Sequence, residues 1–142
     1  MRAGRAHREE LDMTMSSTEK DSHKAAAIHF LQLASSGKVK EAYRAYVGAG
    51  FRHHNPYFQG DAATLMAAME ENAASHPAKA IEILRALEDG DLVAVHACVM
   101  MKPGDRGIAT VHLFRFERDR IVELWDVGQP VPEDSPNKNG MF

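Results

Sequence analysis

The stretch that decides the fold is KAIEILRALEDGDLVAVHACVMM (Lys79–Met101). Apolar side chains alternate along its first half and fill both faces of its second half, which is the pattern of two β-strands. Between these halves, Asp89-Gly90 is typical of a tight hairpin turn. We expect one face of the first strand to carry Ile81, Ile83, Arg85 and Leu87.

Two more strands are predicted downstream, over Ile108–Phe116 and Ile121–Val127. Turn residues at Pro103-Gly104-Asp105 and at Arg118-Asp119 separate them, so the four strands should form an antiparallel meander. The remainder, Gly128–Phe142, is rich in proline and should be an irregular tail. Because it ends in two apolar residues, we expect it to fold back and bury Phe142.

Upstream of the strands, apolar residues recur at steps of three and four, which predicts three helices. Their expected starts are Asp21 or Ser22, Val39 and Asp61, and their expected ends precede Gly37, Gly48 and Pro77. A short extended piece, Phe51–His54, should separate the second helix from the third. Helices followed by a meander predict the α+β class, with three N-terminal helices packed on a curved antiparallel sheet. Strands that are apolar on both faces need a second cover, which we expect to be a partner subunit in a homodimer.

The composition is that of one globular domain. The chain has 142 residues, of which 44% are hydrophobic and 26% charged. Its longest apolar runs are too short for a membrane span, and its net charge of −3 gives no case for binding nucleic acid. The single cysteine, Cys98, excludes an internal disulfide. We expect a flexible extension over residues 1–20, a single domain over residues 21–142, and a cytoplasmic location.

Four separate segments resemble one known superfamily. They are FRHHNPYFQG (Phe51–Gly60), DLVAVH (Asp91–His96), FRFERDRIVELWDVGQPVP (Phe114–Pro132) and the C-terminal NGMF. Together they are similar to the SnoaL-like branch of the nuclear transport factor 2-like superfamily, in order and spacing. The resemblance implies a cone-shaped fold in which a curved sheet and helices enclose a deep pocket, and dimerisation through the sheet. Relatives include polyketide cyclases and ketosteroid isomerase, while other members only bind, so the fold alone does not give the function.

His112 is the first candidate for catalysis, because it lies on the strand face that also carries Thr110 and Phe114. The resemblance places an acidic residue of the family there, and a histidine can also donate or accept a proton near neutral pH. If the two turns set the register, His112 pairs with His96 on one side and with Trp125 on the other. We therefore expect His96, His112 and Trp125 to line one wall of the pocket, with Phe114 beside them.

His53-His54-Asn55 should enter the pocket from elsewhere. Adjacent residues on an extended segment point to opposite sides, so only one of the two histidines can face the pocket. The resemblance favours His54, and it places Asn55 where ketosteroid isomerase has its catalytic aspartate. Asparagine cannot act as a base, and an alternative role for Asn55 is to cap the turn before Pro56.

The remaining candidates are Met69 and Tyr43, which should line the pocket or the core, and Asp126. Asp126 should face away from Trp125 and can pair with a basic residue. Three histidines could hold zinc, but their spacing is not that of a metal site, so we expect no metal. No phosphate-binding glycine loop occurs, so we expect no cofactor.

These features predict a small-molecule pocket protein. Its chemistry would be cofactor-free acid/base catalysis on an apolar, carbonyl-bearing substrate, by aldol cyclisation, isomerisation or dehydration. His112, His54 and Asn55 would act on the substrate. The residues expected to bind it are His96, Trp125, Phe114, Met69 and Tyr43. The alternative is a non-catalytic ligand-binding or accessory module on the same fold, which the lack of a carboxylate at the family's usual places favours.

Overall fold

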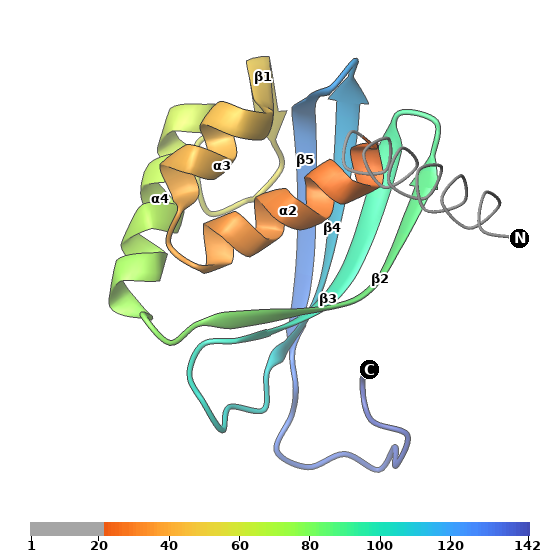
Figure 1. Ribbon diagram of the computed structural model, residues 1–142. Coiled ribbons are helices and arrows are strands. Elements are labelled where there is room, and N and C mark those ends of the chain that lie inside the picture. Colours follow the sequence, from red (N-terminus) through yellow and green to blue (C-terminus); the bar gives the residue numbers. More distant parts are fainter. Residues whose placement is uncertain (1–21) are drawn as a thin grey trace, which may run out of the picture.

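The computed structural model describes residues 22–142, which form three helices and one five-stranded sheet (Figure 1). The expected N-terminal extension, residues 1–20, lies outside the described residues. In chain order the elements are α2 (His23–Ser35), α3 (Val39–Tyr46), β1 (Val47–His53), α4 (Ala62–Ser75), β2 (Ala80–Asp89), β3 (Leu92–Met100), β4 (Ile108–Glu117) and β5 (Arg120–Pro130). No helix within residues 22–142 has both the length and the apolar character needed to cross a membrane.

The helix boundaries follow local capping chemistry. The Ser22 side chain accepts a hydrogen bond from the Ala25 N–H at 3.1 Å, and Asp61 accepts one from the Thr64 N–H at 2.9 Å. Each bond satisfies a backbone donor that the first helical turn leaves free. Past the end of α2, Gly37 has φ +87°, a left-handed conformation that glycine adopts without steric cost. The predicted helix starts at Ser22, Val39 and Asp61 are confirmed to within a residue.

The sheet has the strand order β1-β5-β4-β3-β2. Strands β2 to β5 form the predicted antiparallel meander, whereas β1 pairs with β5 in parallel, so the sheet is mixed. The first strand is also longer than the predicted piece Phe51–His54, since it begins at Val47 as soon as α3 ends. A parallel partner was not visible in the sequence, because β1 and β5 are far apart along the chain.

All three helices lie on one face of the sheet, which is the α+β arrangement expected (Figure 1). The core between the layers includes Phe30 of α2, Phe114 of β4 and Leu124 of β5, whose side chains are at most 1% exposed. On the other face, here called the outer face, Val111 and Val127 remain substantially exposed.

A β-bulge in β2 changes which of its side chains face the core. The register with β3 shifts between Ile83 and Arg85, because β2 contains one extra residue there. Ile81 and Ile83 pack toward the core as expected, but Arg85 and Leu87 point away from it, and Leu87 is 69% exposed. The expected common face of these four residues is therefore wrong beyond the bulge.

The C-terminal segment starts later than expected, because β5 continues to Pro130. It then returns to the outer face, where the ring of Phe142 lies 6.4 Å from that of His96. Phe142 keeps 45% of its surface exposed, so the tail folds back but covers this ring only in part.

Candidate functional site

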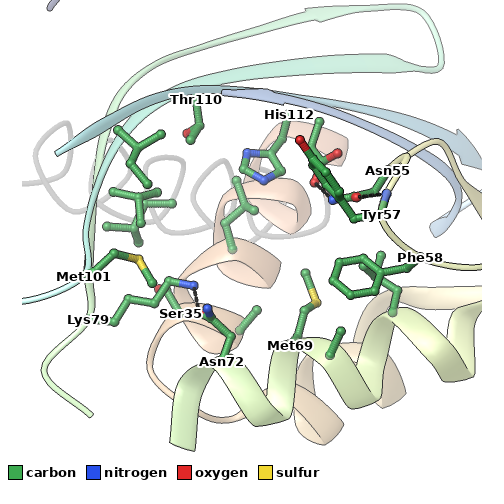
Figure 2. A pocket seen from close by; sticks show the side chains of 18 residues that line it. Ser35, Asn55, Tyr57, Phe58, Met69, Asn72, Lys79, Met101, Thr110 and His112 are labelled. Atoms are coloured by element: carbon green, nitrogen blue, oxygen red, sulfur yellow. Dashed lines mark hydrogen bonds between the residues drawn. The ribbon is translucent and has the colours of Figure 1, made fainter. Parts of the chain in front are cut away.

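A cavity of about 580 Å³ lies between the helices and the concave face of the sheet (Figure 2). Its wall is mostly apolar, with Leu31 from α2, Leu65 and Met69 from α4, and Ile81 from β2. Cavities of this size and polarity are typical sites for small organic ligands. The polar side chains that reach it are Ser35, Asn55, Tyr57, Asn72, Lys79, Thr110, His112 and Asp126.

His112 and Asp126 are directly opposite each other on β4 and β5, and both line the cavity. Opposed residues on one sheet face have their Cβ atoms roughly 5 Å apart, so the imidazole and the carboxylate can act on one ligand. This pairing depends on a second bulge. Phe116 pairs with Ile121 as the turn predicted, but Arg115 then pairs with Glu123, which leaves Val122 as an extra residue. Every later residue of β5 is shifted by one, and Asp126 takes the place expected for Trp125.

Asn55 holds the Asp126 carboxylate from the side. Its Nδ2 donates to Asp126 Oδ2 at 3.1 Å, and its Oδ1 accepts the Tyr57 N–H at 3.0 Å. The second bond fixes which end of the amide faces the carboxylate, since only the nitrogen can donate. Asn55 thus has the capping role of the alternative interpretation, although the turn that it caps runs through Pro56 to Tyr57 and does not precede Pro56. Its amide also contacts Asp126.

The buried ring of His53 holds the loop that contains Asn55 in place through two hydrogen bonds to the loop backbone. It is only 6% exposed, its Nε2 donates to the Gln59 carbonyl at 2.6 Å, and its Nδ1 accepts the Asn55 N–H at 3.1 Å. Both ring nitrogens are therefore occupied by the loop backbone. The inward-facing histidine of the pair is His53, not His54, and it stabilises the loop without lining the cavity.

His112 is held as a neutral imidazole. Burial lowers its pKa to about 4, with a further decrease from the charge of Lys79 and an opposing effect from Asp126. Its Nδ1 is buried and has no hydrogen-bond partner among residues 22–142. A buried N–H without a partner costs more than an unused lone pair. We therefore assign the proton to Nε2, which makes His112 a hydrogen-bond donor on a ring that faces the cavity (Figure 2).

His96 and Trp125 lie on the outer face, so the prediction that they share a wall with His112 is wrong. His96 pairs with Val111, one residue away from the expected partner, because pairing across the turn ends at Val99 and Ile108. Side chains alternate between the two faces of a sheet, so a slip of one residue in the pairing of β3 with β4 places His96 and His112 on opposite faces. His96 instead contacts Arg85, whose Nη1 lies 2.5 Å from its Nδ1.

His54 also lies outside the cavity. Its ring stacks on Trp125 at a centroid distance of 4.9 Å, and its Nε2 lies 2.7 Å from Glu123 Oε2. The same carboxylate accepts hydrogen bonds from Arg52 and Arg115 at 2.8 and 2.9 Å. Hydrogen bonds from Arg52 first, then from His54 and Arg115, hold the pKa of Glu123 at about 2.

Of the other predicted substrate-binding residues, one lines the cavity and two do not. Met69 lines the cavity, whereas Phe114 and Tyr43 are fully or almost fully buried in the core. The Tyr43 hydroxyl donates to Met69 Sδ at 3.2 Å, and burial raises its pKa. The three candidate histidines, His54, His96 and His112, do not converge on one point. Within residues 22–142 no group of three His, Cys, Asp or Glu side chains is placed to hold a metal ion.

Sequence reasoning missed two features of the cavity. Tyr57 and Phe58, in the loop between β1 and α4, line it beside Asn55 (Figure 2). Lys79 and Asn72 contribute the only other hydrogen-bonded side-chain pair among the described residues that line it. An exposed aromatic pair in a loop was a usable signal, but nothing in the sequence marks Lys79 as different from other lysines.

No protein-family profile and no curated protein sequence matches the chain. Solved structures do match it. AclR from Streptomyces galilaeus, a proposed hydroxylase, has a TM-score of 0.63 at 19% identity over 75% of this chain and 87% of that one. IdmH from Streptomyces antibioticus, a proposed polyketide cyclase, has a TM-score of 0.61 at 16% identity over 75% and 92%. An NTF2-like protein of unknown function from Cytophaga hutchinsonii has a TM-score of 0.57 at 18% identity over 74% and 88%.

The chain has the nuclear transport factor 2-like fold. The expectation drawn from four short sequence segments is therefore confirmed for the fold. In this NTF2-like chain the polar groups Asn55, His112 and Asp126 meet at one end of the cavity. At identities below 20% these structures share the fold with this chain, and its chemistry depends on its own side chains.

Proposed function

We propose that this protein catalyses cofactor-free proton transfer on an apolar carbonyl compound bound in the cavity. The observation that carries the proposal is the opposition of Asp126 and His112 on neighbouring strands, with both side chains lining a largely apolar cavity. One group is a carboxylate that can accept a proton, and the other is a neutral imidazole that can donate a hydrogen bond. The role given to His112 from sequence changes from general acid/base to donor, and the base is Asp126.

The proposed step begins at the carbon next to the substrate carbonyl. The Asp126 carboxylate takes a proton from this carbon, and the electron pair of the broken C–H bond moves toward the carbonyl oxygen. The negative charge that develops on this oxygen accepts a hydrogen bond from Nε2–H of His112. Asn55 Nδ2, which donates to Asp126 Oδ2, keeps the carboxylate oriented during the transfer.

The fate of the resulting enolate defines the reaction. Where a carbon–carbon double bond adjoins the deprotonated carbon, a dienolate forms, and return of the proton from Asp126 to its far carbon moves the double bond, which is isomerisation. Attack of the enolate carbon on a second carbonyl gives an aldol ring closure, in which the new alkoxide oxygen takes the proton from Asp126. The proposed polyketide cyclase IdmH shares this fold, which favours ring closure as the reaction to be tested first. A cavity of about 580 Å³ is large enough for a substrate of drug-like size.

Deuterium exchange tests the first step without knowledge of the substrate. Indanone, tetralone and acetylnaphthalene are incubated with the protein in D₂O, and loss of the proton signals next to the carbonyl is followed by NMR. We expect exchange above the buffer rate for at least one ketone, and a decrease of roughly 10²–10⁴-fold in Asp126→Asn. Asp134→Asn, an exposed carboxylate in the tail, is the matched control and should exchange as the wild type does.

Two results would count against the proposal. The wild-type protein could bind the ketones without accelerating exchange, which would favour the ligand-binding module. Alternatively, Asp126→Asn could retain the wild-type rate, which would remove the base from the mechanism. The binding module rested on the lack of a carboxylate at the family's usual places, and Asp126 now supplies one at a different position of the same cavity.

A further inference from the structure

The cavity contains a second polar pair, away from His112 and Asn55 (Figure 2). Lys79 lies just before β2, and its ammonium donates to Oδ1 of Asn72 on α4 at 2.7 Å. Both side chains line the cavity. Their surroundings include Met101 and Ser35, which are labelled beside them in Figure 2. This end of the cavity therefore presents one cation held by one amide.

The Lys79 ammonium has no carboxylate within 4.0 Å among residues 22–142. Among the described residues, only one of its three N–H donors has a partner, which is the Asn72 amide oxygen. Lys79 is only partly exposed, so its charge has lost part of its hydration, and this burial lowers the pKa of the ammonium. A partly dehydrated cation without a counter-ion is unfavourable, so an anionic group at this place would be bound strongly.

The two ends of the cavity carry opposite charges. Asp126 supplies a negative group at one end and Lys79 a positive group at the other. The charge of Lys79 also reaches His112, since it is, after burial, one of the causes that lower the pKa of that imidazole. A ligand with one acidic end would be oriented in a single way, because its reversed pose brings two negative groups together.

We infer that Lys79, held in place by Asn72, binds a carboxylate of the ligand, so that the substrate is a carbonyl compound with an acidic end. This inference rests on the proposed function, because it assigns the opposite end of the same ligand. A single ammonium matches the one negative charge of a carboxylate, whereas a phosphate group carries up to two. The carboxylate at Lys79 then directs the carbonyl end of the molecule toward His112 and Asp126.

A structural role is the alternative for Lys79. Its backbone N–H donates to the His76 carbonyl at 3.0 Å, and its side chain links the start of β2 to α4. Lys79→Gln keeps a hydrogen-bond donor for Asn72 but removes the charge, while Lys79→Arg keeps the charge. A tether is maintained by either variant, whereas an anion site survives only in the second.

Naphthoate and its methyl ester are matched probes, because they share the apolar ring system and differ in charge. Their dissociation constants are measured by calorimetry for the wild type, the two Lys79 variants and Lys138→Gln, an exposed lysine of the tail. We expect Lys79→Gln to weaken naphthoate by about ten- to hundred-fold and to change the ester by less than about two-fold. Lys79→Arg should keep most of the affinity for naphthoate, and Lys138→Gln all of it.

Three other binding results would each contradict the inference. An equal loss for both probes in Lys79→Gln, together with a lowered melting temperature, assigns Lys79 a structural role and overturns the inference. Unchanged binding of both probes also overturns it, while the ketone exchange reaction can still stand. Failure of the wild type to bind either probe would argue against the cavity as a ligand site, and thus against the proposed function as well.

Discussion

Acidification should destabilise this protein through His112 in particular. The perturbation is a decrease from about pH 7.5 to about pH 4.5, compared between the wild type and His112→Gln. Burial holds the pKa of the folded imidazole at about 4, below the value of about 6.5 in an unfolded chain. Between these two values the unfolded chain binds a proton that the folded protein does not. Stability contributed by the neutral ring is therefore complete above about pH 6.5 and decreases as the pH falls toward 4.

The size of the effect follows from the gap between the two pKa values. Each unit corresponds to about 1.4 kcal/mol, so the wild type should lose up to about 2.5 kcal/mol at pH 4.5 through this one group. The ring lines an open cavity, and water there can hydrate part of the added charge. We therefore expect a measured value of about 1–2 kcal/mol, which is still a large share of the stability of a domain.

Urea denaturation at a series of pH values measures this loss. The other histidines are present in both proteins, so the difference between wild type and His112→Gln isolates the His112 contribution. Thr110→Val, on the same strand and face, is the control for a change in the cavity that does not titrate, and it should keep the wild-type pH dependence. If wild type and His112→Gln lose stability in parallel, the imidazole is not held neutral by the fold, and the donor role assigned to it fails.

Three further predictions concern the rest of the molecule. The outer face, which no helix of residues 22–142 covers, should join two copies in a homodimer, and light scattering that finds a monomer at micromolar concentration would contradict this. Deletion of residues 137–142 should lower the melting temperature by a few degrees, because it removes the contact between Phe142 and His96; an unchanged melting curve would mean that the contact contributes nothing. Gly107→Ala should destabilise the fold by about 1–3 kcal/mol in denaturant titrations, since φ is +94° and a Cβ would lie 2.7 Å from Cys98 Sγ; wild-type stability would show that the turn can relax.

Local patterns in the sequence were sufficient for the elements and the fold class. The three-and-four periodicity, the capping residues Ser22 and Asp61, and the turn at Asp89-Gly90 each act within a few residues. They therefore predict helices and strands without knowledge of the tertiary structure. The same holds for the inward position of His112, which shares the alternation of its own strand with the buried Phe114.

The composition of the site was decided by the tertiary structure. The extra residue Val122 in β5 and the longer turn before β4 each shift a register by one. A strand has a period of two, so each shift moved a whole set of side chains to the other face. Trp125 went outward, and Asp126 came into the cavity, although the two residues are neighbours in the sequence.

The other polar residues of the cavity also depend on the folded structure. Asn55 meets Asp126 only because β1 pairs with β5 in parallel, which no local pattern indicates. Lys79 and Asn72 are only seven residues apart and are hydrogen-bonded where the chain turns from α4 into β2, but they reach the cavity only because the folded chain closes it around them. The sequence by itself determined which segments are helices and strands, since those preferences are local. The tertiary structure decided which charges share the cavity, because a one-residue change in register costs little locally and reverses the direction of every side chain that follows.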